Sequence, residues 1–161
     1  MLRPLDRSDI PALTRILRET GAFTDVEVDC ALELLNIVLD DPRQADYLVC
    51  VAEEQGVVAG YILYGPVPLT EGVFDIYWIA TDPTVQGKGF GRQLMIHAEE
   101  DALRRGGRLV CLETSSQGGY QRTRRFYDQC GYLEESRLRD FYKPGDDRIT
   151  YVKRFSANKE S

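Results

Sequence analysis

The sequence predicts an α/β domain of about seven strands and four helices, formed by residues 1–155. Its length of 161 residues, with 43% hydrophobic and 29% charged residues, suits one globular domain with a single core. The spacing of apolar residues alternates between helical and strand-like stretches, and glycine or proline marks most of the boundaries. We expect residues 156–161 to be a frayed tail.

Two helices follow a short first strand. Ser8 is a candidate cap for the first helix, which ends near Gly21 and has apolar residues on one side: Ile10, Leu13 and Leu17. The second helix stops before Pro42 and is predicted by a similar set: Val28, Leu32, Leu35 and Leu39.

Three strands come next. Residues 47–52 and 57–64 are rich in β-branched and aromatic residues and flank a Glu-Glu-Gln-Gly turn, which predicts a hairpin. Pro66 and Pro68 end that hairpin, and residues 73–80 form the third of these strands.

The second half of the chain alternates helix and strand. A helix that closes at Gly106 has an apolar residue at every fourth position: Phe90, Leu94, Ala98 and Ala102. Residues 109–112 form a short apolar strand, which we expect to be buried on both faces. Residues 120–130 form the last helix, and two strands follow at 132–142 and 148–154.

Composition argues against several classes of partner. The net charge of −6 and the pI of about 4.9 disfavour nucleic acid, because neutralising phosphates needs an excess of Lys and Arg. The first residues lack the features of a secretory signal, and no long apolar run occurs. We therefore expect a cytoplasmic protein without a membrane partner. One basic cluster is either a solvated helix face or a contact with a ligand's phosphates: Arg122, Arg124 and Arg125.

The cysteines and the histidine do not form a metal-binding pattern. His97 lies in a helical stretch, where a packing or solvated role is favoured over catalysis. The cysteines have no CxxC pairs and no nearby histidine, so we expect no bound metal and four buried, reduced thiols: Cys30, Cys50, Cys111 and Cys130.

A glycine-rich turn between a strand and a helix is the most informative segment. The start of a helix presents N–H groups without intrahelical partners, together with the positive end of the macrodipole. A diphosphate can therefore bind the main-chain amides between Gln86 and Arg92. Three residues in this turn leave the backbone uncovered: Gly87, Gly89 and Gly91.

Two better-known phosphate loops do not fit this turn. The dinucleotide-binding pattern Gly-x-Gly-x-x-Gly, counted from Gly87, requires a third glycine where Arg92 stands. A nucleoside-triphosphate loop requires glycine at Asp82 and a hydroxyl residue at Gly89. The ligand therefore belongs to another class.

The pattern Gln86-x-x-Gly89-x-Gly91, after a strand and an Asp-Pro pair, resembles the coenzyme A loop of the GNAT superfamily of acyl-CoA-dependent N-acyltransferases. A second stretch, from Phe126 to Tyr132, is similar to the family's Phe-Tyr-x-x-x-Gly-Phe signature. The order of elements also matches, so the resemblance covers essentially the whole chain. It implies a GNAT fold: a mixed, twisted sheet whose two central parallel strands splay apart around acyl-CoA.

The resemblance also implies a cosubstrate, acetyl-CoA, and the residues that bind it. Tyr120 stands where the family has an asparagine that binds the pantetheine arm, so Tyr120 either packs on the coenzyme or lines the acceptor pocket. A backbone N–H of one of three residues is expected to bind the thioester oxygen: Ile79, Ala80 or Thr81. The diphosphate is expected on the loop of Gln86, Gly87, Lys88, Gly89, Phe90, Gly91 and Arg92.

Acetyl transfer to an amine also needs a base and an acid. Asp75, early in one strand, and Glu113, at the end of the next, stand where two branches of the family carry a general base, and either could act through a water. The alternatives are that Asp75 is solvated and that Glu113 accepts backbone hydrogen bonds. Tyr127 is expected to protonate the departing thiolate, or else to fill the core beside Phe126.

The sequence therefore predicts an N-acetyltransferase that moves an acetyl group from acetyl-CoA to a primary amine by direct attack. The alternative is a non-catalytic acyl-CoA-binding sensor or interaction module of GNAT fold. The acceptor stays open among peptide N-termini, lysines, amino acids and polyamines, because loops set specificity on a shared scaffold. A homodimer through the terminal strands is a further expectation.

Overall fold

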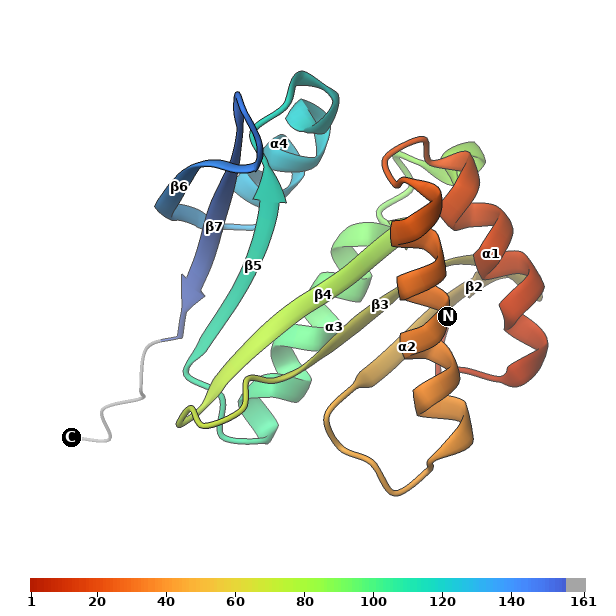
Figure 1. Ribbon diagram of the computed structural model, residues 1–161. Coiled ribbons are helices and arrows are strands. Elements are labelled where there is room, and N and C mark those ends of the chain that lie inside the picture. Colours follow the sequence, from red (N-terminus) through yellow and green to blue (C-terminus); the bar gives the residue numbers. More distant parts are fainter. Residues whose placement is uncertain (156–161) are drawn as a thin grey trace. The chain divides into compact units, whose positions relative to one another are not determined.

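The computed structural model describes residues 1–155 and has the predicted order of elements (Figure 1). Within this part of the chain, four α-helices accompany a mixed sheet of seven strands in the order β1-β2-β3-β4-β5-β7-β6. The predicted tail, residues 156–161, lies outside the described residues. The chain divides into two compact units, one made of Met1–Gly65 and Ile76–Glu100, the other of Pro66–Asp75 and the residues from Asp101 onward.

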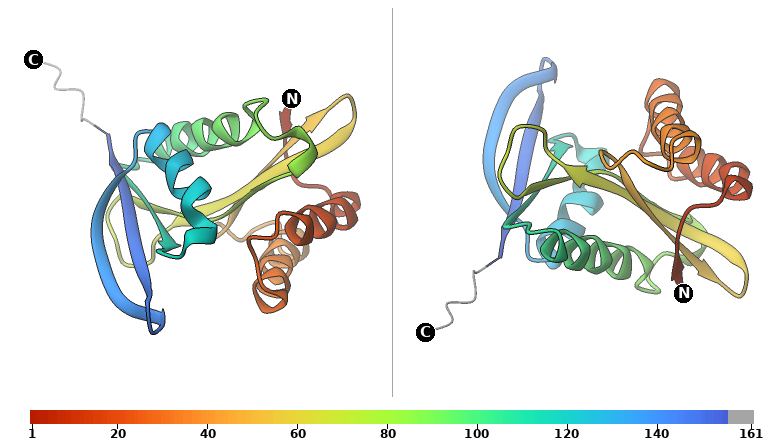
Figure 2. Two further views of the ribbon diagram at one scale, coloured as in Figure 1. Left: turned by 90° about the horizontal axis from the view of Figure 1, so that it is seen from above. Right: turned by 90° about the horizontal axis from the view of Figure 1, so that it is seen from below.

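The first unit follows the segments predicted for it. It contains β1 (Leu2–Arg3), α1 (Ile10–Glu19), α2 (Asp25–Asp40), β2 (Leu48–Glu54) and most of β3 (Val57–Pro66), β4 (Val73–Thr81) and α3 (Phe90–Arg104). β1 pairs antiparallel with β2, and β2 pairs antiparallel with β3 as the predicted hairpin. The helices α1 and α2 cover one face of these strands, and α3 covers the other (Figure 2).

The core of this unit forms where α1 and α2 pack on the strands. The helical spacing read from the sequence places one stripe of each helix in this core, and burying each such side chain contributes about 1.5–3 kcal/mol. The buried residues from the helices are Leu13, Ile16, Leu17, Val28, Ala31 and Leu35, and those from the strands are Val51, Val58, Tyr61, Leu63 and Ala80.

One predicted helix boundary is wrong. Ser8 does not cap the first helix; instead, the Asp6 carboxylate accepts from the Ser8 N–H at 2.9 Å and caps a 3₁₀ turn, Arg7–Asp9, ahead of α1. The Asp9 side chain is buried and accepts two hydrogen bonds from the Arg3 guanidinium, each of 2.8 Å. This bidentate pair ties β1 to the start of α1.

The second unit contains the rest of β4 and α3 together with the C-terminal elements. These are β5 (Leu109–Ser115), α4 (Gln121–Gln129), β6 (Leu133–Lys143) and β7 (Asp146–Arg154). A parallel ladder joins Val73–Asp75 of β4 to Leu109–Cys111 of β5. β7 pairs antiparallel with both β5 and β6. No helix among residues 1–155 is long and apolar enough to span a membrane.

The two faces of β5 differ, so the prediction that this strand is buried on both faces is wrong. Leu112 is buried and stands opposite Tyr151 of β7, whose ring lies 6.0 Å from that of Tyr127 on α4. Cys111 is partly buried and Glu113 is exposed. Because alternate residues of a strand point to opposite faces, this unit has an apolar face under α4 and a polar face opposite it.

Candidate active site

The glycine-rich turn of the first unit joins β4 to α3 with its backbone uncovered. Gly87 and Gly89 have φ angles of +86° and +87°, which favour glycine, and nothing lies within 4 Å of a Cβ built at either position. The Gln93 N–H bonds the Gly89 carbonyl at 3.0 Å. The N–H groups of residues 90–92 therefore begin α3 without intrahelical partners, as an anion site requires.

Asp82 anchors the beginning of this turn. Its carboxylate is 5% exposed and accepts from the Thr84 N–H at 2.9 Å, the Thr84 hydroxyl at 2.8 Å and the Arg15 guanidinium at 3.0 Å. Burial by itself raises the pKa of Asp82, but these hydrogen bonds outweigh it and lower the pKa overall. The turn is thereby fixed to α1 through Arg15.

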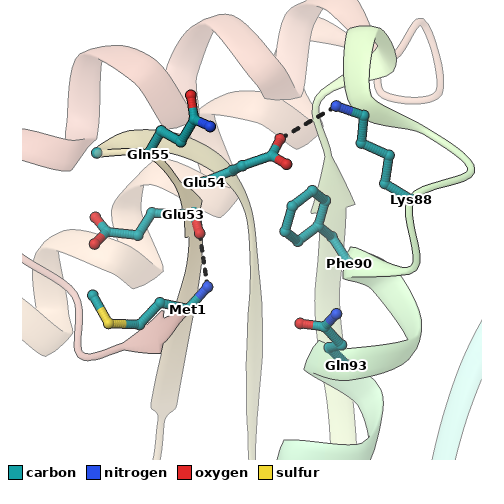
Figure 3. Close-up of a pocket in the computed structure, with 8 residues that line it drawn as sticks. Met1, Glu53, Glu54, Gln55, Lys88, Phe90 and Gln93 are labelled. Atoms are coloured by element: carbon teal, nitrogen blue, oxygen red, sulfur yellow. Dashed lines mark hydrogen bonds and ion pairs between the residues drawn. The ribbon is translucent and has the colours of Figure 1, made fainter.

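Lys88 extends from the turn toward the hairpin between β2 and β3 (Figure 3). Its Nζ lies 3.4 Å from Glu54 Oε2, and the two side chains are 56% and 45% exposed. A pair this exposed contributes less than about 1 kcal/mol, so Lys88 can turn toward an anion at small cost. With Phe90 and Gln93, Lys88 lines a hollow of about 480 Å³ beside the hairpin.

The three candidate donors to the thioester oxygen lie at the end of β4. Thr81 is the last residue of the strand, and the next N–H, that of Asp82, donates to the Ala59 carbonyl at 2.7 Å. A Cβ built on Gly60 would lie 2.5 Å from the Ala80 carbonyl oxygen, so glycine permits the close approach of β3 and β4 here. Which of Ile79, Ala80 and Thr81 donates stays a prediction.

The two predicted catalytic carboxylates lie on the polar face of the second unit. Asp75 pairs with Cys111 in the parallel ladder, and Glu113 follows Cys111 by two residues on the same face. Burial raises the pKa of Asp75 to about 7, and the negative charge of Glu113 adds to this effect. Asp75 is therefore not the solvated strand-end acid of the alternative interpretation.

The same surroundings keep Cys111 in its thiol form. Burial raises the pKa of Cys111 to about 12, with further contributions from the charges of Asp75 and Glu113. A thiol with such a pKa is a poor nucleophile at neutral pH. The prediction of four buried cysteines is confirmed for Cys50 only, because Cys30 is exposed on α2 and Cys111 and Cys130 are partly buried.

Glu113 lies next to the guanidinium of Arg148. The sequence-based alternative had expected backbone N–H donors at this position. The Oε1 of Glu113 lies 3.8 Å from the Nε of Arg148 on β7, and the two side chains are 49% and 31% exposed. Sequence reasoning missed Arg148, because its position beside Glu113 depends on the register of β7 against β5. Ser115 is the residue opposite Arg148 in that ladder.

Tyr127 is buried within a cluster of aromatic rings. Its ring centroid lies 5.6 Å from that of Phe126 and 6.4 Å from that of Tyr132. Burial, with a smaller contribution from Cys130, raises the pKa of Tyr127, so the phenol stays protonated at neutral pH. Tyr120 lies in a 3₁₀ turn, Gly118–Tyr120, directly before α4 and not inside the helix.

One arginine of the basic cluster at the start of α4, Arg124, binds the main chain of the preceding loop. Arg124 donates to the main-chain carbonyls of Ser115 and Gln117 at 2.9 and 2.8 Å, so it holds the loop between β5 and α4. This contact makes Arg124 a structural residue, which neither sequence interpretation had anticipated. Among residues 1–155, no group of three or more His, Cys, Asp or Glu side chains could hold a metal ion.

Comparisons with known proteins identify the family. The model of the acetyltransferase (GNAT) family matches residues 11–132. A protein from Desulfovibrio desulfuricans that is assigned to the GNAT acetyltransferases is 39% identical, with 96% of this chain and 98% of that chain covered and a TM-score of 0.92. The chain belongs to the GNAT family of acetyltransferases.

More distant structures share the fold. An aminoglycoside 6'-N-acetyltransferase complexed with coenzyme A is 16% identical, with 99% of each chain covered and a TM-score of 0.77. The ribosomal-protein-S18-alanine N-acetyltransferase of Escherichia coli is 22% identical, with 100% of this chain and 97% of that chain covered and a TM-score of 0.76. No curated protein matches the chain significantly.

Proposed function

We propose that this protein transfers an acetyl group from acetyl-CoA to the nitrogen of a primary amine by direct attack. The observation that carries the proposal is Asp75, a carboxylate whose pKa of about 7 suits a general base at neutral pH. Family membership and the open amides of the turn between Gln86 and Arg92 support acetyl-CoA as the donor. The relative crystallised with coenzyme A supports the same cosubstrate.

The base removes a proton that the acceptor carries at neutral pH. Deprotonating a lysine-like amine of pKa about 10.4 at pH 7 costs roughly 4.6 kcal/mol, whereas an α-amine near 8 costs about 1 kcal/mol. Asp75 accepts this proton, directly or through a water. Glu113 supplies negative charge beside it, which raises the pKa of Asp75, makes its carboxylate a stronger base and favours a cationic amine nearby.

The neutral amine then attacks the thioester carbonyl carbon. The carbonyl oxygen becomes negatively charged, and a backbone N–H from Ile79, Ala80 or Thr81 stabilises it by roughly 3 kcal/mol. The carbon–sulfur bond breaks, and the coenzyme A thiolate takes a proton from the Tyr127 phenol. The nitrogen loses its second proton as the tetrahedral intermediate collapses, and this proton restores the Tyr127 phenol through water, while Asp75 releases its proton to solvent. The products are the acetylated amine and the free thiol. Tyr120 contacts the pantetheine arm or the acceptor.

The alternative is a protein that only binds acyl-CoA. A half-buried carboxylate with a pKa near neutrality favours the enzyme, since binding a thioester needs no base. The test incubates the protein with acetyl-CoA and a panel of primary amines, follows free thiol and identifies the products by mass. Amine-dependent thiol release with a product heavier by one acetyl group supports the enzyme. Coenzyme binding without any acetylated amine supports the binding protein.

A further inference from the structure

A guanidinium lies next to the candidate bases on the polar face of the second unit. Arg148 Nε is 3.8 Å from Glu113 Oε1, which is an ion pair but too long for a hydrogen bond. Asp75, on β4, lies on the side of Glu113 away from Arg148. It is close enough to Glu113 for the negative charge of Glu113 to raise the pKa of Asp75. Glu113 therefore stands between a second carboxylate and a guanidinium.

An aromatic ring orients Arg148. Its Cζ lies 4.5 Å from the centroid of the Phe141 ring, a stacked arrangement that a planar guanidinium favours. Its Nε is buried and has no hydrogen-bond partner among residues 1–155. The side chain as a whole is 31% exposed, so its outer N–H groups are within reach of a ligand.

Other arginines of the same strands are used differently. Arg137 donates to Glu134 at 3.0 Å and to Asp147 at 3.1 Å, and Arg154 donates to Glu135 at 2.6 Å. These arginines are neutralised by hydrogen-bonded carboxylates of the chain. Among residues 1–155, Arg148 instead makes the longer ion pair of 3.8 Å with Glu113, which leaves the exposed N–H groups of its guanidinium able to donate to a ligand oxygen.

We propose that Arg148 binds a carboxylate of the acceptor, which makes the acceptor a small molecule with a carboxylate close to its primary amine, such as a free amino acid. This inference rests on the proposed transfer of acetyl groups to an amine. Asp75 and Glu113 attract the amine, and the guanidinium fork beside them matches the two oxygens of a carboxylate. A polycationic acceptor would instead meet the positive charge of Arg148 next to the base.

The test compares amino acids with their amides, which keep the amine and the side chain but lose the negative charge. A panel of the common amino acids and the matching amides is assayed with acetyl-CoA. For the best acceptor, we expect the amide to have a KM at least about tenfold higher than the acid. In Arg148→Gln, the KM for the acid rises about 10- to 100-fold, while the KM for the amide changes less than about threefold.

Two variants separate this role from a structural one. Arg148→Lys keeps the charge but loses the fork, and we expect it to fall between the wild type and Arg148→Gln. Arg154→Gln removes a neutralised arginine from the same strand and should leave the preference for the acid unchanged. The KM for acetyl-CoA should be the same in all of these variants, which shows that they fold.

Equilibrium binding provides a second measurement of the role of Arg148, and it does not require catalytic turnover. Calorimetry in the presence of coenzyme A measures the same acids and amides on the wild type and Arg148→Gln. Acids that bind only the wild type support the inference even if no amine is acetylated, in which case the proposed function alone fails. Equal use or equal binding of acids and amides by the wild type overturns the role of Arg148 and leaves the acetyl transfer intact.

Discussion

The glycine-rich turn of the first unit and the polar face of the second unit differ in the atoms that they offer to a ligand: main-chain N–H groups in the turn, and charged side chains on the polar face. The turn offers main-chain N–H groups, and its Lys88 side chain is held only by a weak pair with Glu54. The polar face depends on three side chains that change one another's charge: Asp75, Glu113 and Arg148. A backbone site should tolerate most substitutions except those of its glycines, whereas a side-chain site should respond to single changes of charge.

The largest effect is expected on the polar face. Asp75→Asn removes the proposed base without changing the size of the side chain, so kcat/KM should fall by about 10²- to 10⁴-fold. The wild-type rate should rise with pH through about 7, because Asp75 acts in its ionised form, and the variant should lose this rise. Steady-state rates from pH 5.5 to 9 measure both. A variant that keeps the rate and the pH profile would assign the base to another group.

A smaller effect is expected at the leaving group. Tyr127→Phe removes the phenol but keeps the ring that packs against Tyr132 and Tyr151, so the fold should survive. We expect kcat to fall roughly tenfold or more, with little change in the affinity for acetyl-CoA. Kinetics and calorimetry on the same preparation separate the two quantities. Full turnover in the variant would mean that water, not Tyr127, protonates the thiolate.

The smallest effect is a shift in pH dependence. Glu113→Gln removes a negative charge that raises the pKa of Asp75, so this pKa should fall and the rise of kcat/KM should move to lower pH. Burial is the larger cause of the raised pKa, so we expect the shift to be partial. The pH profile of the variant measures it. A loss of activity at every pH would instead identify Glu113 as the base.

The sequence predicted the glycine-rich turn more completely than the polar face. Gly87 and Gly89 have the positive φ angles that favour glycine, and Gly91 lies in the first turn of α3, so the turn and the helix after it were predicted correctly. Asp75 and Glu113 were named as candidates, but the contact of Glu113 with Arg148 depends on strand register. That register belongs to the ladder of β5 and β7, where Ser115 stands opposite Arg148, and no local pattern in either strand reveals it.

Two smaller errors have the same origin. Ser8 and Asp6 are both good helix caps, and only the 3₁₀ turn at Arg7–Asp9 decides for Asp6. The short apolar stretch of β5 suggests a strand buried on both faces, although Leu109 and Cys111, on the face away from α4, are only partly buried. In each case the local sequence allows two structures: hydrogen bonds among Asp6, Ser8 and Asp9 select the first, and packing within the second unit selects the other.

Calorimetric titration with coenzyme A and with pantetheine, which lacks the diphosphate, tests most directly whether main-chain amides of the turn bind the diphosphate. Gly89→Val places a side chain at φ +87° in the turn, and Gly106→Val is a matched control, because its φ is +85° and its surroundings are equally open. Each change costs about 1–2 kcal/mol of backbone strain. We expect the wild type and Gly106→Val to bind coenzyme A at least about tenfold more tightly than pantetheine, and Gly89→Val to lose this difference. Equal affinity of Gly89→Val and the wild type for coenzyme A would contradict the role of the turn.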